Sequence, residues 1–546
     1  MDFDSWKMAS PSTYPDLTLY LVTDSTPAIL GERDLCRVVE EAVKGGVTIV
    51  QYRDKHAETS DMITTAQKLH KITRKYQIPL LVNDRVDVAS AVGAEGVHLG
   101  QDDMHISEAR KILGDHAIIG VSVANMEEAE NAFQHGADYL GVGTMFPTPT
   151  KTDTKSIIGT AGTRAILEAI AVQGIDMPCV AIGGIKSGNV QRVLYQTSSV
   201  SPYFSLAGLA VVSEIMGSTA PLASAQELRS LISTGGSVFY SPTPPNILPE
   251  TDLSTLLSQI PSITRLHAKT NPLSHNMMNT VVQNFAANVC LAAGASPIMS
   301  PNGLEAADLA GLRGGLVINM GTLTPDSMQN YLLATAEYNR LGSPTVFDPV
   351  GGGATAVRRR AIKELMAGSY FDVIKGNEGE IAAVWDPDPM PQTQQQRGVD
   401  SGPSTRAPRE KAQLACRLAR RERCIVLLTG AVDYLSDGGR TLAVSNGHPF
   451  LGGITGSGCA LGSIVASYLA AAAQQQQDKL QVTLAALLHY EIAAELAVTR
   501  GGAKGPGTFV AAFIDCLYAI AQLDEDAPVV AGVNWTAGAK VEFVSV

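Results

Sequence analysis

The chain has 546 residues, of which 45% are hydrophobic and 17% charged, a composition typical of soluble α/β proteins and a length that predicts about two to four domains. The formal net charge of -12 argues against the basic face that nucleic-acid binding requires, so we expect no nucleic-acid partner. Seven cysteines without a C-x-x-C pair indicate neither a disulfide framework nor a zinc site. We find no secretory signal and expect no membrane-spanning run, which predicts a cytoplasmic protein without a membrane partner.

Short apolar runs alternate with helix-like segments through the first half of the chain. Near-continuous apolar runs are typical of parallel strands covered on both faces. Eight β-α units in about 200 residues favour a (β/α)8 TIM barrel, and we predict this domain over residues 1–235. The expected strands are residues 17–24, 47–55, 78–84, 96–103, 117–123, 137–146, 178–185 and 205–213.

A proline-rich stretch, residues 236–250, predicts a linker between two domains. Residues 251–546 then form a second predicted α/β domain. Within it, residues 386–410 are polar and rich in proline, which predicts a disordered surface insertion without chemistry. The expected strands of the second domain are residues 316–320, 345–350, 372–377 and 424–430.

Polar residues follow the predicted barrel strands, at the rim where such barrels carry their chemistry. Asp84 and Asp103 end neighbouring strands and are the hard oxygen donors that Mg2+ prefers. Arg53 and Lys55 would point the same way from an extended strand, because side chains alternate. Their charges would neutralise a diphosphate that the metal also bridges.

Each of these residues also has a purely structural interpretation. Arg53 and Asp84 could instead form an ion pair across the rim. His98, within an apolar strand, is more easily a packed core histidine than a base. The segment from Thr148 to Lys151 could be an ordinary polar loop.

The first half resembles the thiamine-phosphate synthase family over about residues 15–230, in the ordered strings QYRDK, VND, HLGQDD, GVS, GVGTMFPTPTK, AIGGI and VVS. That family joins a hydroxymethylpyrimidine diphosphate to a thiazole phosphate and releases pyrophosphate. The resemblance implies that pyrophosphate leaves first and that the thiazole nitrogen captures the pyrimidine cation, without a protein nucleophile.

The resemblance also implies roles for individual residues. Asp84 and Asp103 would bind Mg2+. The pyrimidine diphosphate would contact Gln51, Tyr52, Arg53, Asp54, Lys55, Asn83, Ser122 and Lys151. The thiazole phosphate would contact Thr148, Thr150, Gly184, Val212 and Ser213.

A glycine-rich turn, Gly456-Ser457-Gly458-Cys459, opens a helix-like segment of the second domain. Glycines allow backbone amides to approach an oxyanion, and a helix N-terminus adds partial positive charge. This arrangement can stabilise a transferring phosphoryl group. The alternative is simple helix capping. The domain has no G-x-x-x-x-G-K-[ST] motif, so we expect no P-loop fold.

Other residues of the second domain add context to that turn. Asn377-x-x-Glu380 follows a predicted strand and resembles the motif that organises Mg2+ in ribokinase-like kinases. Asp348 could support this metal region or cap the GGGAT turn. Arg358 and Thr429 are candidates for contacts with ATP.

The second half resembles the hydroxyethylthiazole kinase family, of ribokinase-like α/β fold, also through NPLSHNMMNTVVQNFAAN and GASPIMS. That family phosphorylates the thiazole alcohol with ATP. Cys459 would occupy the position of the catalytic base, its pKa lowered by the helix N-terminus, although a small buried cysteine is the structural alternative. Gln283 stands where a substrate-contacting methionine is expected, beside an anion hole formed by Gly456 and Gly458. Members of the family are trimers, which implies a homo-oligomer.

Together the halves match, in order, the fused enzymes of thiamine biosynthesis in fungi. Our interpretation is a bifunctional transferase with small-molecule substrates, ATP as co-substrate and Mg2+ as cofactor. One alternative is a barrel isomerase or aldolase fused to a sugar kinase, which would leave the paired aspartates unexplained. The other is a catalytically silent sensor of thiamine metabolites.

Overall fold

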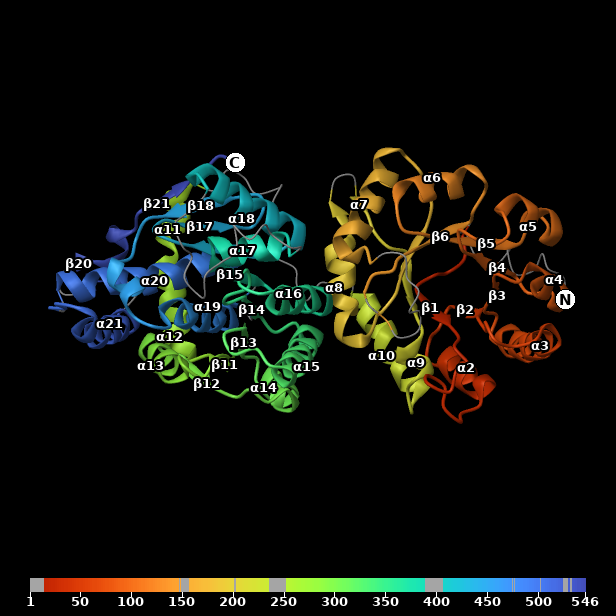
Figure 1. The fold of residues 1–546 in the computed structure, drawn as a ribbon, viewed down its shortest axis with the longest axis horizontal. Coiled ribbons are helices and arrows are strands. Elements are labelled where there is room, and N and C mark those ends of the chain that lie inside the picture. Colours follow the sequence, from red (N-terminus) through yellow and green to blue (C-terminus); the bar gives the residue numbers. More distant parts are fainter. Residues whose placement is uncertain are drawn as a thin grey trace. The chain divides into compact units, whose positions relative to one another are not determined.

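The computed structural model describes residues 14–146, 148, 157–200, 203–234, 252–387, 406–473, 475, 477–500, 502–523, 529–530 and 533–546. The chain divides into two compact units, residues 1–238 and 239–546 (Figure 1). The predicted linker, residues 236–250, lies outside the described residues. Each unit has its own sheet, and the two are described separately.

The first unit is a closed barrel of parallel strands in the order β1-β10-β7-β6-β5-β4-β3-β2, which confirms the predicted TIM barrel. Seven of the strands are β1 (Leu19–Val22), β2 (Ile49–Tyr52), β3 (Leu80–Asn83), β4 (Gly96–Leu99), β5 (Ile118–Val123), β6 (Tyr139–Val142) and β7 (Cys179–Ile182). The eighth is β10 (Gly208–Val211), preceded by the short pair β8 (Ser199–Val200) and β9 (Tyr203–Phe204). The strands are buried almost throughout, as expected where helices cover the outer face of the sheet.

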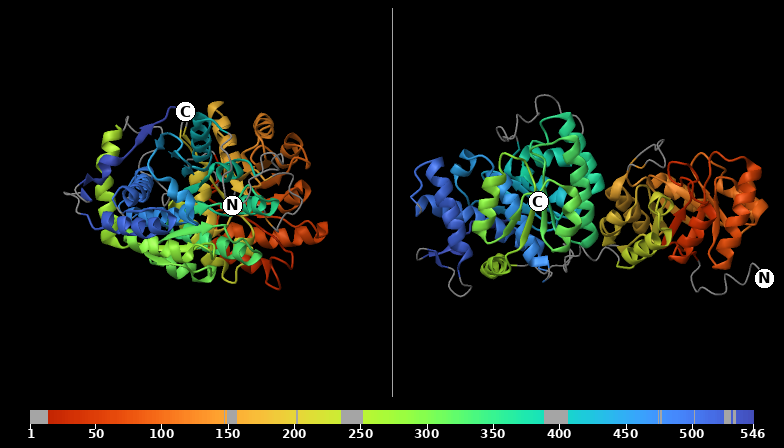
Figure 2. Two further views of the ribbon diagram at one scale, coloured as in Figure 1. Left: turned by 60° about the vertical axis from the view of Figure 1, so that its left-hand side comes forward. Right: turned by 90° about the horizontal axis from the view of Figure 1, so that it is seen from below.

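Helices follow the strands around the barrel (Figures 1 and 2). They are α2 (Leu35–Lys44), α3 (Thr59–Lys75), α4 (Val86–Val92), α5 (Ile106–Leu113), α6 (Met126–Gln134), α7 (Gly159–Val172), α8 (Ser187–Thr197), α9 (Ser213–Met216) and α10 (Pro221–Thr234). Local signals fix their starts: Asp34 caps α2 through Arg37 N, and Asn125 caps α6 through Glu128 N. These two helices, α2 and α6, therefore begin at side chains that follow strands β1 and β5 along the chain.

The second unit is built on a nine-stranded sheet in the order β12-β11-β13-β14-β15-β16-β17-β18-β21. Its parallel part comprises β11 (Leu273–Met277), β12 (Ser296–Ile298), β13 (Gly315–Asn319), β14 (Thr345–Asp348), β15 (Val373–Asn377) and β16 (Ile425–Thr429). An antiparallel edge follows, with β17 (Asp433–Ser436), β18 (Thr441–Val444) and β21 (Val541–Phe543). Strands β19 (Val529–Val530) and β20 (Val533–Asn534) pair separately.

Helices lie on both faces of this sheet. Those of the α19 face share a core with Val317, Val346 and Val373, and neighbouring strand residues point to the other face because side chains alternate. The α19 group is α11 (Leu253–Ser258), α12 (Ile260–Thr270), α13 (Gln283–Ala293), α19 (Ser457–Ala473), α20 (Lys479–Thr499) and α21 (Pro506–Ala521). The other helices are α14 (Ala306–Gly311), α15 (Pro325–Leu341), α16 (Ala356–Gly368), α17 (Glu378–Trp385) and α18 (Pro408–Glu422), with 3-10 turns at Gly303–Glu305, Pro449–Gly453 and Trp535–Gly538.

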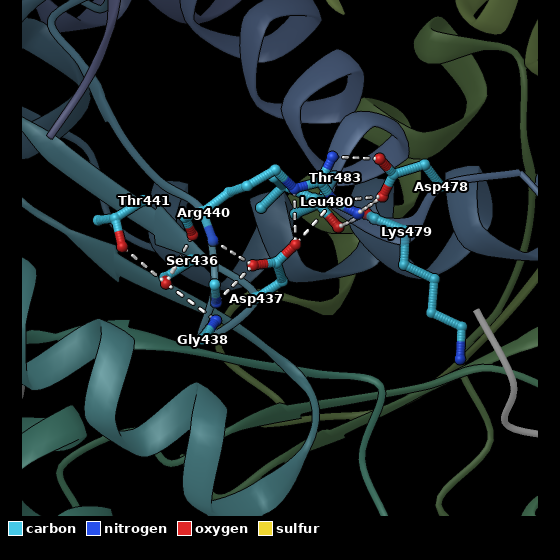
Figure 3. Close-up of polar contacts among 10 residues, drawn as sticks. Ser436, Asp437, Gly438, Arg440, Thr441, Asp478, Lys479, Leu480 and Thr483 are labelled. Atoms are coloured by element: carbon cyan, nitrogen blue, oxygen red, sulfur yellow. Dashed lines mark hydrogen bonds and ion pairs between the residues drawn. The ribbon is translucent and has the colours of Figure 1, made fainter. Parts of the chain in front are cut away.

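Helix α20 is long and apolar enough to span a membrane by length and composition alone, but 83% of its apolar window is buried inside the unit. It is therefore a core helix. A charged clamp holds its N-terminus (Figure 3): Arg440, in the turn between β17 and β18, donates to both carboxylate oxygens of Asp478 at 2.6 and 2.9 Å. Asp478 in turn caps α20 by accepting from Leu480 N.

Several predicted strands end earlier than expected, and the predicted insertion ends earlier too. Strand β2 stops at Tyr52 rather than at residue 55, so strand alternation does not aim Arg53 and Lys55 as we argued. Most of the predicted insertion 386–410 lies outside the described residues, but α18 already begins at Pro408, with a proline in its first turn.

Two candidate phosphate sites

The aspartates predicted to bind metal do meet at the barrel rim. The carboxyl groups of Asp84 and Asp103 lie within hydrogen-bonding distance of each other, and Lys55 is close enough to lower the pKa of Asp84. Burial and the neighbouring Asp103 outweigh Lys55, so the net pKa of Asp84 is raised. Asp84 adopts a left-handed backbone, with φ of 61°, a conformation that aspartate tolerates better than most residues. Two repelling carboxylates beside a lysine form an arrangement that a cation and a phosphate would relieve.

The side chains of Tyr52 and Asp54 are engaged within the protein, so they contribute less to the predicted diphosphate site than the resemblance implied. The hydroxyl of Tyr52 bonds to Thr65 on α3, so its side chain points away from the barrel interior. The Asp54 carboxylate accepts from Ser25 Oγ at 2.5 Å and from the backbone N–H groups of His56 and Ala57. Although partial burial acts the other way, these bonds lower its pKa. Tyr52 and Asp54 therefore shape the loop.

The side chain of Arg53 is not tied to Asp84. Among the ion pairs of the described residues there is none between them, while the backbone of Arg53 is fixed by Thr23, whose Oγ1 accepts from Arg53 N at 2.9 Å. The structural alternative of a rim ion pair is therefore absent. Arg53 remains half-buried at the rim with Asn83, which ends β3.

A hydrogen-bonded chain crosses the barrel interior between two predicted site residues. Gln51 Nε2 donates to Tyr20 Oη at 2.9 Å, and Tyr20 and Tyr139 share a bond of 2.7 Å. His98 Nδ1 lies 2.8 Å from Tyr139 Oη, and its Nε2 lies 2.9 Å from Ser122 Oγ. Both ring nitrogens of His98 are thus engaged, which agrees with a packed histidine rather than a free base.

The second predicted anion region of the rim lies between β7 and β10, which are paired neighbours in the barrel. Gly184 follows β7 with φ of 64°, a left-handed conformation for which glycine is best suited. Val212 and Ser213 follow β10, and Glu214 accepts from Ser187 N at 2.8 Å, so the two loops are tied together. Thr148 is described and half-buried. Thr150 and Lys151 lie outside the described residues.

The predicted anion hole of the second unit forms the start of α19. Gly456 has φ of 85°, and a Cβ atom there would lie 2.1 Å from Val282 Cγ1, so the turn requires glycine. A Cβ atom on Gly458 would meet only Lys375 Nζ, at 3.6 Å. The Tyr490 hydroxyl donates to Ser457 O at 2.8 Å and so holds the turn in place. The glycine turn therefore lies directly beside a buried lysine.

Lys375 is the residue that sequence reasoning missed. It lies on β15, is 3% exposed, and bonds Asp348 Oδ1 at 3.1 Å, while Asn319 donates to Asp348 Oδ2 at 2.9 Å. Burial alone would lower the pKa of Lys375, but Asp348, Cys459 and Glu380 raise it, so the lysine is charged. The available signal was a lysine inside the apolar strand DVIKGN, because buried lysines are rare unless paired.

The Cys459 thiol has the predicted position but not the predicted acidity. It lies in the first turn of α19, and Asn279 donates to its Sγ at 3.6 Å. Burial and the nearby Asp348 raise the pKa of Cys459 to about 11 in spite of Lys375 and a hydrogen bond from Asn319. Our expectation of a lowered pKa is corrected: desolvation outweighs the helix N-terminus.

Glu380 is held by the backbone around it. Its two carboxylate oxygens accept from Gly351 N and Asn377 N, each at 2.8 Å, and Asn377 Oδ1 accepts in return from Glu380 N. The N-x-x-E motif thus forms the capping box of α17. Burial and Asp348 raise the pKa of Glu380 to about 7. The Asp348 side chain bonds Lys375 and Asn319 and does not cap the GGGAT turn.

The remaining predicted kinase residues lie around the same edge of the sheet. Arg358 donates to the carbonyl oxygens of Met320, Gly321 and Val350, so its guanidinium braces two loops instead of lying open to ATP. Thr429 ends β16 in register with Asn377. Gln283 begins α13, next to the Val282 that packs against Gly456.

Comparisons with known proteins agree with this division. The family model "Thiamine monophosphate synthase" matches residues 19–215, and that of the "Hydroxyethylthiazole kinase family" matches residues 263–523. The "Probable thiamine biosynthetic bifunctional enzyme" of Schizosaccharomyces pombe is 43% identical over 538 residues, which cover 96% of this chain and 98% of that protein. The chain belongs to the thiamine biosynthetic bifunctional enzymes.

Further relatives cover the whole chain or one unit. The "Thiamine biosynthetic bifunctional enzyme" of Saccharomyces cerevisiae is 36% identical over 531 residues, covering 92% of this chain and 95% of that protein. The "Hydroxyethylthiazole kinase" of Moorella thermoacetica is 41% identical over 257 residues, covering 47% of this chain and 91% of that protein. The chain is thus a bifunctional transferase in which a thiamine-phosphate synthase barrel precedes a ribokinase-like kinase unit.

Proposed function

We propose that the two units catalyse consecutive steps. The kinase unit phosphorylates hydroxyethylthiazole with ATP. The barrel joins the resulting thiazole phosphate to hydroxymethylpyrimidine diphosphate, forming thiamine phosphate and pyrophosphate. The observation that carries the proposal is a pair of separate arrangements suited to phosphate: the Asp84–Asp103 pair beside Lys55 on the barrel, and the Gly456–Gly458 turn beside Lys375 on the kinase.

In the barrel, the proposed reaction needs charge stabilisation more than a nucleophile. Departure of pyrophosphate from the pyrimidine leaves negative charge at the rim, where Arg53 and Lys55 lie. The thiazole phosphate is held by the loops of Gly184 and Ser213, which places its ring nitrogen to capture the pyrimidine cation. The pairing of β7 with β10 supports this placement, because it brings the two loops together.

In the kinase unit, the backbone amides of Gly456 to Gly458 and the Lys375 ammonium would stabilise the transferring phosphoryl group. Cys459 is the proposed acceptor of the alcohol proton, since it lies in the first turn after the anion hole. We propose that Thr429, which is in register with Asn377 at the end of β16, contacts the nucleotide. Val282 packs against the same turn, and we propose that the neighbouring Gln283 contacts the thiazole.

The two donor sets differ in how well they suit Mg2+. The Asp84–Asp103 pair fits, because Mg2+ prefers a few carboxylates with water and phosphate oxygens. The described residues contain no cluster of three or more candidate ligands, so water and substrate oxygens would complete the coordination. Bound there, Mg2+ would supply Lewis-acid stabilisation of the leaving diphosphate. Glu380 has both oxygens occupied by backbone donors, so we propose that it acts on a kinase-bound Mg2+ only from outside its direct ligands.

We further propose a cytoplasmic homo-oligomer built on kinase trimers. The likeness to the trimeric kinase family supports it, and light scattering on the purified chain would measure it. A monomeric mass at assay concentrations would refute the trimer.

The decisive assay supplies hydroxyethylthiazole, ATP, Mg2+ and the pyrimidine diphosphate to the folded protein and detects thiamine phosphate by chromatography. We expect product only when all four are present. Turnover of a sugar or of an aldol substrate instead would favour the isomerase or aldolase fused to a sugar kinase. Binding of the ligands without turnover would favour the sensor.

A further inference from the structure

The barrel interior holds a chain of polar side chains whose hydrogen-bond direction can be worked out from its chemistry. The chain runs from Gln51 on β2 through Tyr20, Tyr139 and His98 to Ser122 on β5. Its two ends, Gln51 and Ser122, are residues that the resemblance to thiamine-phosphate synthases implies contact the pyrimidine diphosphate. Its three middle residues have no assigned role, and this inference rests on the proposed synthase site.

The amide end of the chain fixes the direction of every bond. Gln51 Nε2 can only donate, so Tyr20 Oη accepts from it. The Tyr20 hydroxyl then donates a hydrogen bond to Tyr139 Oη, and the Tyr139 hydroxyl donates to His98 Nδ1. His98 therefore carries its proton on Nε2, which donates to Ser122 Oγ. The reverse direction would leave the Tyr20 proton without an acceptor among the described residues, at a side chain that is 1% exposed. An unpaired buried donor is costly.

Steric fit holds the two central rings in place independently of these bonds. A Cβ atom on Gly120 of β5 would lie 1.9 Å from the ring of Tyr139. A Cβ atom on Gly141 of β6 would lie 2.9 Å from Cε1 of His98. The absence of both side chains makes room for the rings, whose centroids are 5.6 Å apart. Burial also raises the pKa values of Tyr20 and Tyr139, so both phenols keep their protons.

Ser122 is the last residue of this hydrogen-bonded chain. Its carbonyl oxygen accepts from Gln101 Nε2 at 2.6 Å, which fixes the backbone. Its hydroxyl oxygen accepts from His98, and the hydroxyl proton has no acceptor among the described residues. We infer that His98, with Tyr139 and Tyr20 behind it, is a positioning residue that presents the Ser122 hydroxyl as a hydrogen-bond donor to a ring nitrogen of the pyrimidine diphosphate.

The test uses the full chain with thiazole phosphate and pyrimidine diphosphate supplied directly, so that the kinase step is bypassed. Tyr139→Phe removes one hydroxyl and lets His98 reverse its tautomer, which turns Ser122 into a donor toward His98. We expect kcat/KM for the pyrimidine diphosphate to fall roughly tenfold, the effect of one lost hydrogen bond to substrate. KM for the thiazole phosphate should stay within about twofold, given that Ser122 does not contact it.

The Ser122→Ala background separates positioning from packing. If His98 and Tyr139 act through the Ser122 hydroxyl, Tyr139→Phe should cost less than about twofold once that hydroxyl is gone, because residues that act through one group are not additive. Equal losses in both backgrounds would overturn the inference. His98→Gln, which can still offer an N–H near Ser122, should retain more activity than His98→Leu; the opposite order would also overturn it.

Two controls test whether the effects are specific to the His98 position and to the synthase reaction. His70→Asn removes another buried histidine of the same barrel, bonded to Glu95 at 3.0 Å, and should leave both KM values unchanged. Kinase turnover, measured on every variant, should equal that of the unaltered chain. If the unaltered chain itself fails to join the two substrates, the proposed function fails; if it does so and the variants show additive losses, only this inference fails.

Discussion

At the scale of single residues, the kinase site combines four ionisable groups whose states depend on one another: the buried Lys375, Asp348 and Glu380, and the half-buried Cys459. Lys375 is charged because Asp348 faces it at 3.1 Å, while Cys459 and Glu380 both have raised pKa values in the same low-dielectric region. Removing any one charge changes the desolvation balance of the others. A substitution at any one of these groups should therefore affect both stability and proton transfer.

The Cys459 thiol gives the first prediction. The pKa of Cys459 is raised to about 11. At pH values below this pKa, the thiolate fraction increases about tenfold for each unit by which the pH is raised. If the thiolate is the base, kinase kcat should increase with pH between about 7 and 9.5 in a steady-state ATP assay. Cys459→Ala should lower kcat and flatten this profile while synthase activity is unchanged. The same slope in both proteins would show that the cysteine only packs.

The Lys375–Asp348 pair gives the second. Lys375→Met leaves Asp348 buried without its counter-charge, which should cost about 3–5 kcal/mol of unfolding free energy. The loss would appear as a lower urea midpoint followed by tryptophan fluorescence, because the described tryptophans, Trp385 and Trp535, both lie in the second unit. Lys269→Met, at an exposed position of α12, is the matched control. An unchanged midpoint for Lys375→Met would contradict the pair's role.

At the scale of elements, periodicity predicted the strands and helices well but placed their ends poorly. The predicted strand 96–103 ends at Leu99, because Asp103 turns back to accept from Gly100 N at 2.6 Å. Such a turn depends on one side-chain bond that hydrophobic pattern does not encode. Lys375 and the hydrogen bonds that join Tyr20, Tyr139 and His98 were missed for the same reason: each side chain lies within an apolar strand, and its partner comes from another strand far along the chain.

The antiparallel edge of the kinase sheet, which we did not predict, carries the clamp on α20 (Figure 3). Arg440 pairs with Asp437 at 2.7 Å and Asp478 at 2.6 Å, and its side chain is only 13% exposed. Asp478→Ala removes both the cap and a partner of this charge, which should cost about 2–4 kcal/mol. Asp478→Ser restores the cap alone and should recover about 1 kcal/mol. Equal urea midpoints for the two variants would show that the ion pair carries the whole effect.

At the scale of the whole molecule, each unit buries its own core against its own sheet, a closed barrel in the first unit and an open nine-stranded sheet in the second. Each proposed phosphate site is assembled from residues of one unit. The barrel site draws on the ends of several parallel strands, and the kinase site on β14, β15 and the start of α19. The thiazole phosphate is therefore the only link that the chemistry requires between the two activities.

This independence predicts that two variants, each lacking one of the two activities, complement each other when mixed. Asp103→Ala removes one of the paired rim carboxylates and should abolish coupling while leaving thiazole phosphorylation intact. Gly458→Asp places a carboxylate in the anion hole, where a Cβ atom meets only Lys375 Nζ at 3.6 Å, and should abolish the kinase alone. Each variant by itself should form no thiamine phosphate from hydroxyethylthiazole, ATP and pyrimidine diphosphate, whereas their mixture should form it after a lag in which free thiazole phosphate accumulates. Thiazole phosphate accumulating in the mixture without thiamine phosphate would mean that the intermediate must pass within one chain.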